Sequence, residues 1–117
     1  MDFDRFTVAL LQLRPDAPEL DEAAAAALQD AHMNHLAELH ESGVLLAAGP
    51  LLDTDSPFRG LSIFRVGPAE AQALAERDPG VLAGRYSVTV LPWMVPGGAV
   101  TFSPTRFPHS AAEAAGD

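Results

Sequence analysis

The side chains of this chain best suited to proton transfer are its histidines, and three of the four lie close together. His32, His35 and His40 fall in one stretch with helical character, whereas His109 lies near the C-terminal end. An imidazole placed in a cavity can act as a general acid or base at physiological pH. The chain has no cysteine, which excludes a thiol nucleophile, a thiolate metal site and a disulfide.

Helical spacing separates these histidines into two groups. His32 and His35 recur with Leu28 and Leu39 on one apolar face, and His40 points elsewhere. Two interpretations of His35 stay open on the residues alone. One is a core histidine with internally hydrogen-bonded ring nitrogens, and the other is a general acid or base whose tautomer a carboxylate fixes.

We expect no metal ion and no cofactor. His32 and His35 could both contact a metal, but a stable site needs three or four suitable ligands. His40 is expected to turn away, and His109 lies in a loose tail. The Gly49-Pro50 turn lacks the glycine-rich spacing of a phosphate loop, and neither a nucleophile elbow nor a nucleotide fingerprint occurs.

The charge balance limits the classes of partner that the chain is expected to bind. Seven basic residues, all arginine, stand against sixteen acidic ones, for a net charge of −9. This balance argues against nucleic acid and against anionic membrane surfaces. The N-terminus shows no secretion signal, and no apolar run approaches the roughly 20 residues needed to span a bilayer. We therefore expect a cytoplasmic protein that binds neither nucleic acid nor membrane.

The elements that must position the histidines follow from apolar periodicity and from turn residues. At 117 residues the chain is expected to be one domain. Glycine and proline punctuate it, with Gly43 ending the long helix and a polar hairpin loop at 53–57. Strands are expected at 5–13, 44–52, 60–66 and 85–93, and helices at 19–42 and 69–77. A tail follows from 96 to 117, with a candidate short strand near 100–102 and a frayed end.

The order strand-helix-strand-strand-helix-strand predicts an α+β protein of the ferredoxin-like split βαβ (βαββαβ) plan. Its four-stranded antiparallel sheet carries both helices on one face and leaves the other bare. The first strand is apolar on both faces, with Phe6, Val8 and Leu10 on one and Ala9 and Leu11 on the other. We therefore expect a homodimer whose two sheets pack face to face in a dimeric α+β barrel. Assembly beyond the dimer stays open.

At several places in this order the chain resembles the YCII-related (YciI-like) family of small dimeric α+β barrel proteins. The resemblance covers roughly residues 5 to 95, which sets a domain at 1–95 and a tail at 96–117. It rests on His35 to Leu51 (HLAELHESGVLLAAGPL), Arg59-Gly60, Asp78-Pro79, Ala83-Gly84 and Leu91-Pro-Trp93.

The resemblance implies a catalytic His–Asp pair, which falls on His35 and Asp78. Asp78 ends the second helix, on the same sheet face as the first, so it can orient the imidazole; Asp-Pro is also a common helix stop. The family further implies cofactor-free elimination or isomerisation of ring compounds. This chain has His32 where an arginine is frequent in the family, and Gly80 where an aromatic residue often follows Asp-Pro.

Further residues are candidates for substrate binding. Two arginines at strand starts could clamp a carboxylate, or could form surface ion pairs instead. Trp93 and Tyr86 line a pocket or fill the dimer core. The candidate set is His32, Gly49, Pro50, Arg59, Arg85 and Trp93.

Three functions are compatible with these observations. The first is an isomerase- or lyase-type enzyme acting on a small metabolite. The second is a non-catalytic module that holds a small ligand. The third is a structural dimer whose sheet face or tail recruits another protein.

Overall fold

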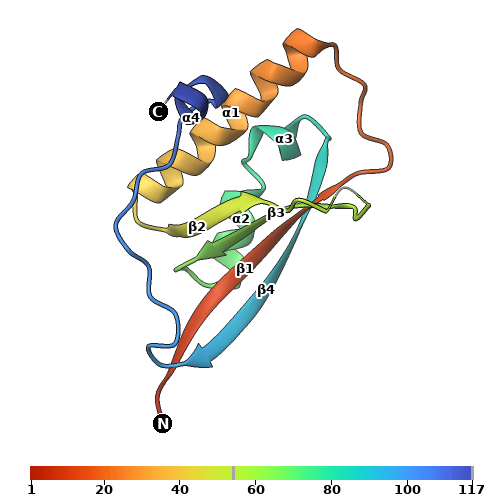
Figure 1. Ribbon diagram of the computed structural model, residues 1–117. Coiled ribbons are helices and arrows are strands. Elements are labelled where there is room, and N and C mark those ends of the chain that lie inside the picture. The colour runs from red at the N-terminus through yellow and green to blue at the C-terminus, as the bar shows by residue number, and fades with distance from the viewer. Residues whose placement is uncertain (54, 117) are drawn as a thin grey trace.

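The computed structural model describes residues 1–53 and 55–116, and it has the predicted α+β architecture (Figure 1). The four strands form one antiparallel sheet in the order β2-β3-β1-β4, which is the ferredoxin-like plan. Two short helices, α3 and α4, add to the expected elements. The elements are β1 (Phe3–Leu13), α1 (Glu22–Glu41), β2 (Leu45–Pro50), β3 (Phe58–Phe64), α2 (Pro68–Ala75), α3 (Pro79–Leu82), β4 (Tyr86–Pro96) and α4 (Ala111–Gly116).

Local sequence sets both ends of α1. The Asp21 side chain accepts a hydrogen bond from the Ala24 amide at 2.7 Å, which satisfies one of the free amides of the first turn. At the other end Gly43 has a φ of 88°, the left-handed conformation that stops a helix and suits glycine. Both ends therefore follow from residues visible in the sequence.

One face of the sheet carries the core. Ala9, Leu45, Phe64 and Ala71 form a buried cluster that unites β1, β2, β3 and α2. Side chains of both long helices pack against it, including Leu36 from α1. The helices α1 and α2 therefore cover the same face of the sheet. The side chains that they direct toward the sheet lie in one layer.

The helices leave the opposite, apolar face of the sheet uncovered, although Phe102 of the tail packs against Phe6 there, with ring centroids 5.5 Å apart. Phe6 and Val8 alternate with the buried residues of β1, so they point away from the helices. Phe6 pairs with Trp93, and Val8 pairs with Ile63 and Leu91. Leu91 is 49% exposed and Trp93 is 37% exposed. The expectation of strands that are apolar on both faces is thus confirmed.

The C-terminal tail differs from expectation. No strand forms at 100–102, and the chain runs on without regular structure to the short helix α4. The Ala111 amide donates to the Asp30 carboxylate of α1 at 2.9 Å. The tail therefore returns along the first helix, as Figure 1 shows in blue.

Two further expectations concern the hairpin loop at 53–57 and helices that could span a membrane. The hairpin loop at 53–57 includes Thr54, which lies outside the described residues, and beside it the Asp53 carboxylate accepts from the Asp55 amide at 3.0 Å. Within the described ranges, no helix is long and apolar enough to cross a membrane.

Candidate active site

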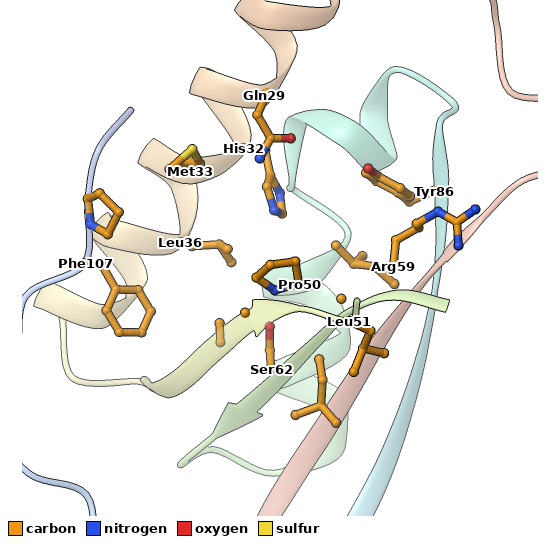
Figure 2. A pocket seen from close by; sticks show the side chains of 16 residues that line it. Gln29, His32, Met33, Leu36, Pro50, Leu51, Arg59, Ser62, Tyr86 and Phe107 are labelled. Carbon is orange, nitrogen blue, oxygen red and sulfur yellow. The ribbon is translucent and has the colours of Figure 1, made fainter. Parts of the chain in front are cut away.

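A cavity of about 430 Å³ lies between α1 and the edge of the sheet formed by β2 and β3 (Figure 2). The first helix contributes His32 and the second and third strands contribute the floor, while the tail closes one side with Phe107. Most of the lining is apolar, with a few polar groups set among it. This composition is typical of pockets for small organic ligands. The polar lining groups are Gln29, His32, Arg59, Ser62 and Tyr86.

His32 is the cavity residue with the best-defined polar environment. Its Nδ1 lies 2.6 Å from Oδ2 of Asp78, and its side chain is 16% exposed. Asp78 is 2% exposed, and its other oxygen, Oδ1, accepts from the Gly80 amide at 2.7 Å. Both carboxylate oxygens are thereby used, so the carboxylate is held in one orientation toward α1.

The position of Asp78 follows from its role at a helix start. It is the N-cap residue of α3, and Pro79 occupies the first helical position, where proline fits well. The cap bond to Gly80 turns the remaining carboxylate oxygen away from α3. That oxygen then faces His32 on the neighbouring helix.

The predicted pairing of His35 with Asp78 is wrong in its choice of histidine. The Nε2 atom of His35 instead lies 3.2 Å from the carbonyl oxygen of Leu74 in α2. Both histidines face inward, as helical spacing predicted. However, His35 lies one turn further along α1, so it meets the last turn of α2, while His32 meets Asp78, which lies beyond the end of α2 at Ala75. His35 therefore fits the core-histidine interpretation.

Tyr86 lines the cavity near His32. The ring centroids of His32 and Tyr86 lie 6.4 Å apart. A smaller cavity of about 220 Å³ adjoins the first and shares Gln29, His32 and Tyr86 with it. In Figure 2 the Tyr86 hydroxyl points inward, on the side of His32 and Gln29.

Gly80 and Arg85 determine how Tyr86 sits. A Cβ atom added at Gly80 would lie 2.7 Å from Cδ2 of Tyr86, so only glycine allows the ring this close approach. The Arg85 Nε donates to the Tyr86 hydroxyl at 3.1 Å. Arg85 was a candidate for clamping a substrate carboxylate or for a surface ion pair, and in the structure its side chain donates to this phenol. The hydroxyl keeps its own hydrogen for a group in the cavity.

The other predicted binding residues divide between the two sheet faces. Gly49, Pro50 and Arg59 all line the cavity. Arg59 also donates to the backbone carbonyl of Ser56. Trp93 does not reach the cavity: it packs against Phe6 on the uncovered face, with ring centroids 6.0 Å apart.

Some lining residues were not predicted, although a signal for part of them exists. Gln29, His32, Met33 and Leu36 recur at helical spacing and all line the cavity. The periodicity that selected His32 therefore also contained Gln29. Phe107 had no comparable signal, because it comes from a segment without regular periodicity.

A metal is not favoured by the donor geometry. Across residues 1–53 and 55–116, no group of three histidine, aspartate or glutamate side chains converges on one point. The single imidazole–carboxylate contact, His32 with Asp78, is better suited to proton transfer than to metal binding.

An exposed ion pair lies outside the cavity. Arg14 donates to both carboxylate oxygens of Asp16 at 2.9 and 3.0 Å. These hydrogen bonds lower the pKa of Asp16 and raise the pKa of Arg14. Because both side chains are in solvent, substitutions in this pair can be compared with substitutions made inside the cavity.

The sheet order and the helices on one face define an α+β protein of the ferredoxin-like plan, with an open, largely apolar cavity between α1 and the sheet. The chain belongs to the family of the YCII-related domain, whose model matches residues 6–94. The predicted family is thus confirmed. No curated protein matches the chain.

Solved structures that are similar to this chain include the following two. One is the 5-chloro-2-hydroxyhydroquinone dehydrochlorinase TftG from Burkholderia phenoliruptrix AC1100, in complex with 2,5-dihydroxybenzoquinone. It has 22% identity and a TM-score of 0.49, over 75% of this chain and 92% of that chain. The other is a dimeric protein of unknown function and ferredoxin-like fold from Bacteroides fragilis NCTC 9343. It has 16% identity and a TM-score of 0.38, over 76% of this chain and 93% of that chain.

Proposed function

We propose that the cavity is the active site of a cofactor-free enzyme in which His32 transfers a proton to and from a small, largely apolar ligand. The observation that carries the proposal is the 2.6 Å contact between His32 Nδ1 and Asp78 Oδ2, made from within the cavity lining. This assignment moves the catalytic role expected for His35 to His32 and keeps Asp78 as its partner.

The contact with Asp78 selects one tautomer of His32. A carboxylate accepts hydrogen bonds, so Nδ1 carries the hydrogen and Nε2 carries the lone pair. Within the described part of the chain, Nε2 has no hydrogen-bond partner, and His32 lines the cavity. The lone pair is therefore free to accept a proton from a ligand. The buried carboxylate then stabilises the imidazolium that forms.

The rest of the lining favours a class of substrate. Apolar walls suit a compact ring or carbonyl compound, and proton removal next to a carbonyl places negative charge on oxygen. The Tyr86 hydroxyl, whose oxygen already accepts from Arg85, can donate to that oxygen. We infer an isomerisation or elimination in which His32 removes a proton from carbon and Tyr86 stabilises the developing oxyanion.

The test uses 5-nitrobenzisoxazole, a generic probe of a base in an apolar pocket. Removal of its ring C–H proton breaks the N–O bond and releases a coloured cyanophenolate, with no cofactor needed. We expect His32→Gln to lower the rate of ring opening by about 10²- to 10⁴-fold, because general-base catalysis contributes on that scale. Glutamine retains a donor toward Asp78, so the buried carboxylate keeps a partner.

The matched control is His35→Gln, which changes a histidine of the same helix that hydrogen-bonds to α2. It should leave the rate near that of the unmodified chain. The proposal fails if His35→Gln loses as much activity as His32→Gln. It also fails if the unmodified chain opens the ring no faster than free imidazole at equal concentration.

The apolar lining equally favours a second candidate, a non-catalytic module that holds a small ligand. Such a module would be protected thermally by ligands that it does not convert. The two functions separate when a substrate panel is screened in parallel for thermal protection and for product. Protection without product from any protecting compound favours the binding module.

We also infer that the protein forms a homodimer through the uncovered sheet face. Leu91 and Trp93 are large apolar side chains on that face, and their exposure is unfavourable in a monomer. A second copy of the same face would bury both sets. The proposed dimer surface and the cavity lie on opposite faces of the sheet, so substitutions can test dimer formation and ligand binding separately.

A further inference from the structure

The segment 105–111, called here the C-terminal strap, lies along α1 and forms one side of the cavity. It contributes Phe107 and Pro108 to the lining. It also lies beyond residues 6–94, the part that the family model matches. Figure 2 shows Phe107 on the cavity side of α1, near Leu36.

His109 attaches the strap to α1 through both of its ring nitrogens. Nδ1 lies 2.6 Å from Oδ1 of Asn34, and Nε2 lies 2.7 Å from Oε2 of Glu41. The amide nitrogen of Asn34 donates to Glu38 at 3.2 Å, which leaves its oxygen for His109. Both contacts are made to side-chain oxygen atoms of α1. One side chain thus bridges two turns of the helix.

His40 holds Phe107, the aromatic residue of this side of the cavity, in place. Its ring stacks on that of Phe107, with centroids 3.9 Å apart and an angle of 5° between the planes. Its nitrogens contact the backbone carbonyls of Leu45 at 2.8 Å and Thr105 at 3.2 Å. His40 therefore links the end of α1, the start of β2 and the strap. This explains why it turns away from the face shared by His32 and His35.

We propose that the strap is a specificity element of this chain, in which Phe107 limits the size of the ligands that the cavity admits. The wall is made by a segment outside the family domain, whereas the groups suited to chemistry, His32 and Asp78, lie within that domain. The ligand class is a compact, planar, largely apolar molecule that fits between Phe107 and the strand floor. This role concerns admission to the cavity, and it holds whether or not His32 transfers a proton.

The experiment compares two fluorescent phenols that differ in size, 2-naphthol and 1-hydroxypyrene. Their dissociation constants are measured for the full chain and for Phe107→Ala. We expect Phe107→Ala to shift the affinity ratio toward 1-hydroxypyrene by at least about tenfold, the scale on which a pocket wall discriminates ligand size. His109→Gln, which loosens the strap and leaves the core unchanged, should shift the ratio in the same direction by less.

Arg106→Ala is the matched control, because this side chain belongs to the strap, is 76% exposed and forms an ion pair with Glu113 of α4 at 3.5 Å. Its affinity ratio should equal that of the unmodified chain. An unchanged ratio in both Phe107→Ala and His109→Gln would overturn the proposal, as would an equal shift in Arg106→Ala. Failure of every form of the chain to bind either phenol would also overturn it. A shifted ratio together with inactive ring-opening assays would refute the proton-transfer role alone.

Discussion

His32 and Asp78 are separated by 46 positions in the chain, yet the imidazole Nδ1 and the carboxylate Oδ2 lie 2.6 Å apart. The contact joins the middle of α1 to the start of α3. Because the carboxylate is also bonded to the Gly80 amide, neither partner is free to turn away without losing a bond. This relationship is the basis of the first prediction.

Asp78→Asn should remove proton-transfer activity and preserve the fold. Asparagine is a good N-cap, so its oxygen can still accept from Gly80 and α3 should persist. Its amide nitrogen would then face His32 Nδ1 as a donor and force the hydrogen onto Nε2, where it blocks the base. We expect ring opening of 5-nitrobenzisoxazole to fall by about 10²- to 10⁴-fold. Nitrogen NMR of the His32 ring measures the tautomer directly, and an unchanged tautomer would contradict the explanation.

His35→Ala should act on stability and leave catalysis intact. The substitution removes the hydrogen bond to the Leu74 carbonyl and part of the packing between α1 and α2. We expect the free energy of unfolding to fall by about 1–2 kcal/mol, measured by urea denaturation. The rate of ring opening, measured on the folded variant, should stay close to that of the unmodified chain. A loss of rate comparable to that of Asp78→Asn would return the catalytic role to His35.

Gly80→Ala should disturb the wall of the cavity that Tyr86 forms. The new methyl group would lie 2.7 Å from the ring, so either the ring or the turn must move. Overpacking of this kind costs about 1–3 kcal/mol of unfolding free energy. Gly116→Ala is the matched control, because this glycine also lies in a short helix and a Cβ atom there meets nothing within 4 Å. Equal effects of the two substitutions on stability would show that the contact with Tyr86 is unimportant.

Leu91→Arg should prevent self-association. This residue is 49% exposed on the uncovered sheet face, and a charge there would have to be buried between two copies. Sedimentation at micromolar concentration should show dimers for the unmodified chain and monomers for the variant. Leu82→Arg provides the comparison, since Leu82 is 73% exposed on α3, on the helix side of the molecule. A monomeric unmodified chain would refute the dimer.

The Arg14–Asp16 pair predicts a small effect of pH with a definite sign. The pKa of Asp16 is lowered in the folded state by its hydrogen bonds from Arg14. Its contribution to stability is therefore present above the pKa of the unfolded chain, and it is lost as the pH falls through the lower folded value. Asp16→Asn should therefore lower the melting temperature slightly at neutral pH and leave it unchanged at low pH, which reduces its acid dependence. A rise in stability on acidification that depends on Asp16 would contradict this assignment.

The fold was accessible from the sequence because its signals are local. Alternating apolar residues marked the strands, and Asp21 and Gly43 marked the ends of α1. The order of these elements predicted the ferredoxin-like plan with a four-stranded antiparallel sheet, and the structure has this sheet. The apolar residues on both faces of β1 also predicted an uncovered apolar sheet face.

The choice between His32 and His35 was not accessible in the same way. Periodicity places both on the inner face of α1, but it does not give the offset between α1 and α2 along their axes. That offset decides which histidine meets Leu74 and which meets Asp78. The wall made by Phe107 was missed for a related reason, since contacts between an irregular segment and a helix leave no repeat in the sequence.

The cap bond made by Asp78 has an evolutionary consequence. Aspartate and asparagine codons differ by one base, and both residues begin a helix well. A single mutation would therefore abolish the proposed proton transfer without a selective cost in folding. Inactive descendants of such a protein would keep the pocket and stay available for roles in ligand storage or sensing. Lineages with aspartate and with asparagine at this position are then expected to separate enzymes from their non-catalytic relatives.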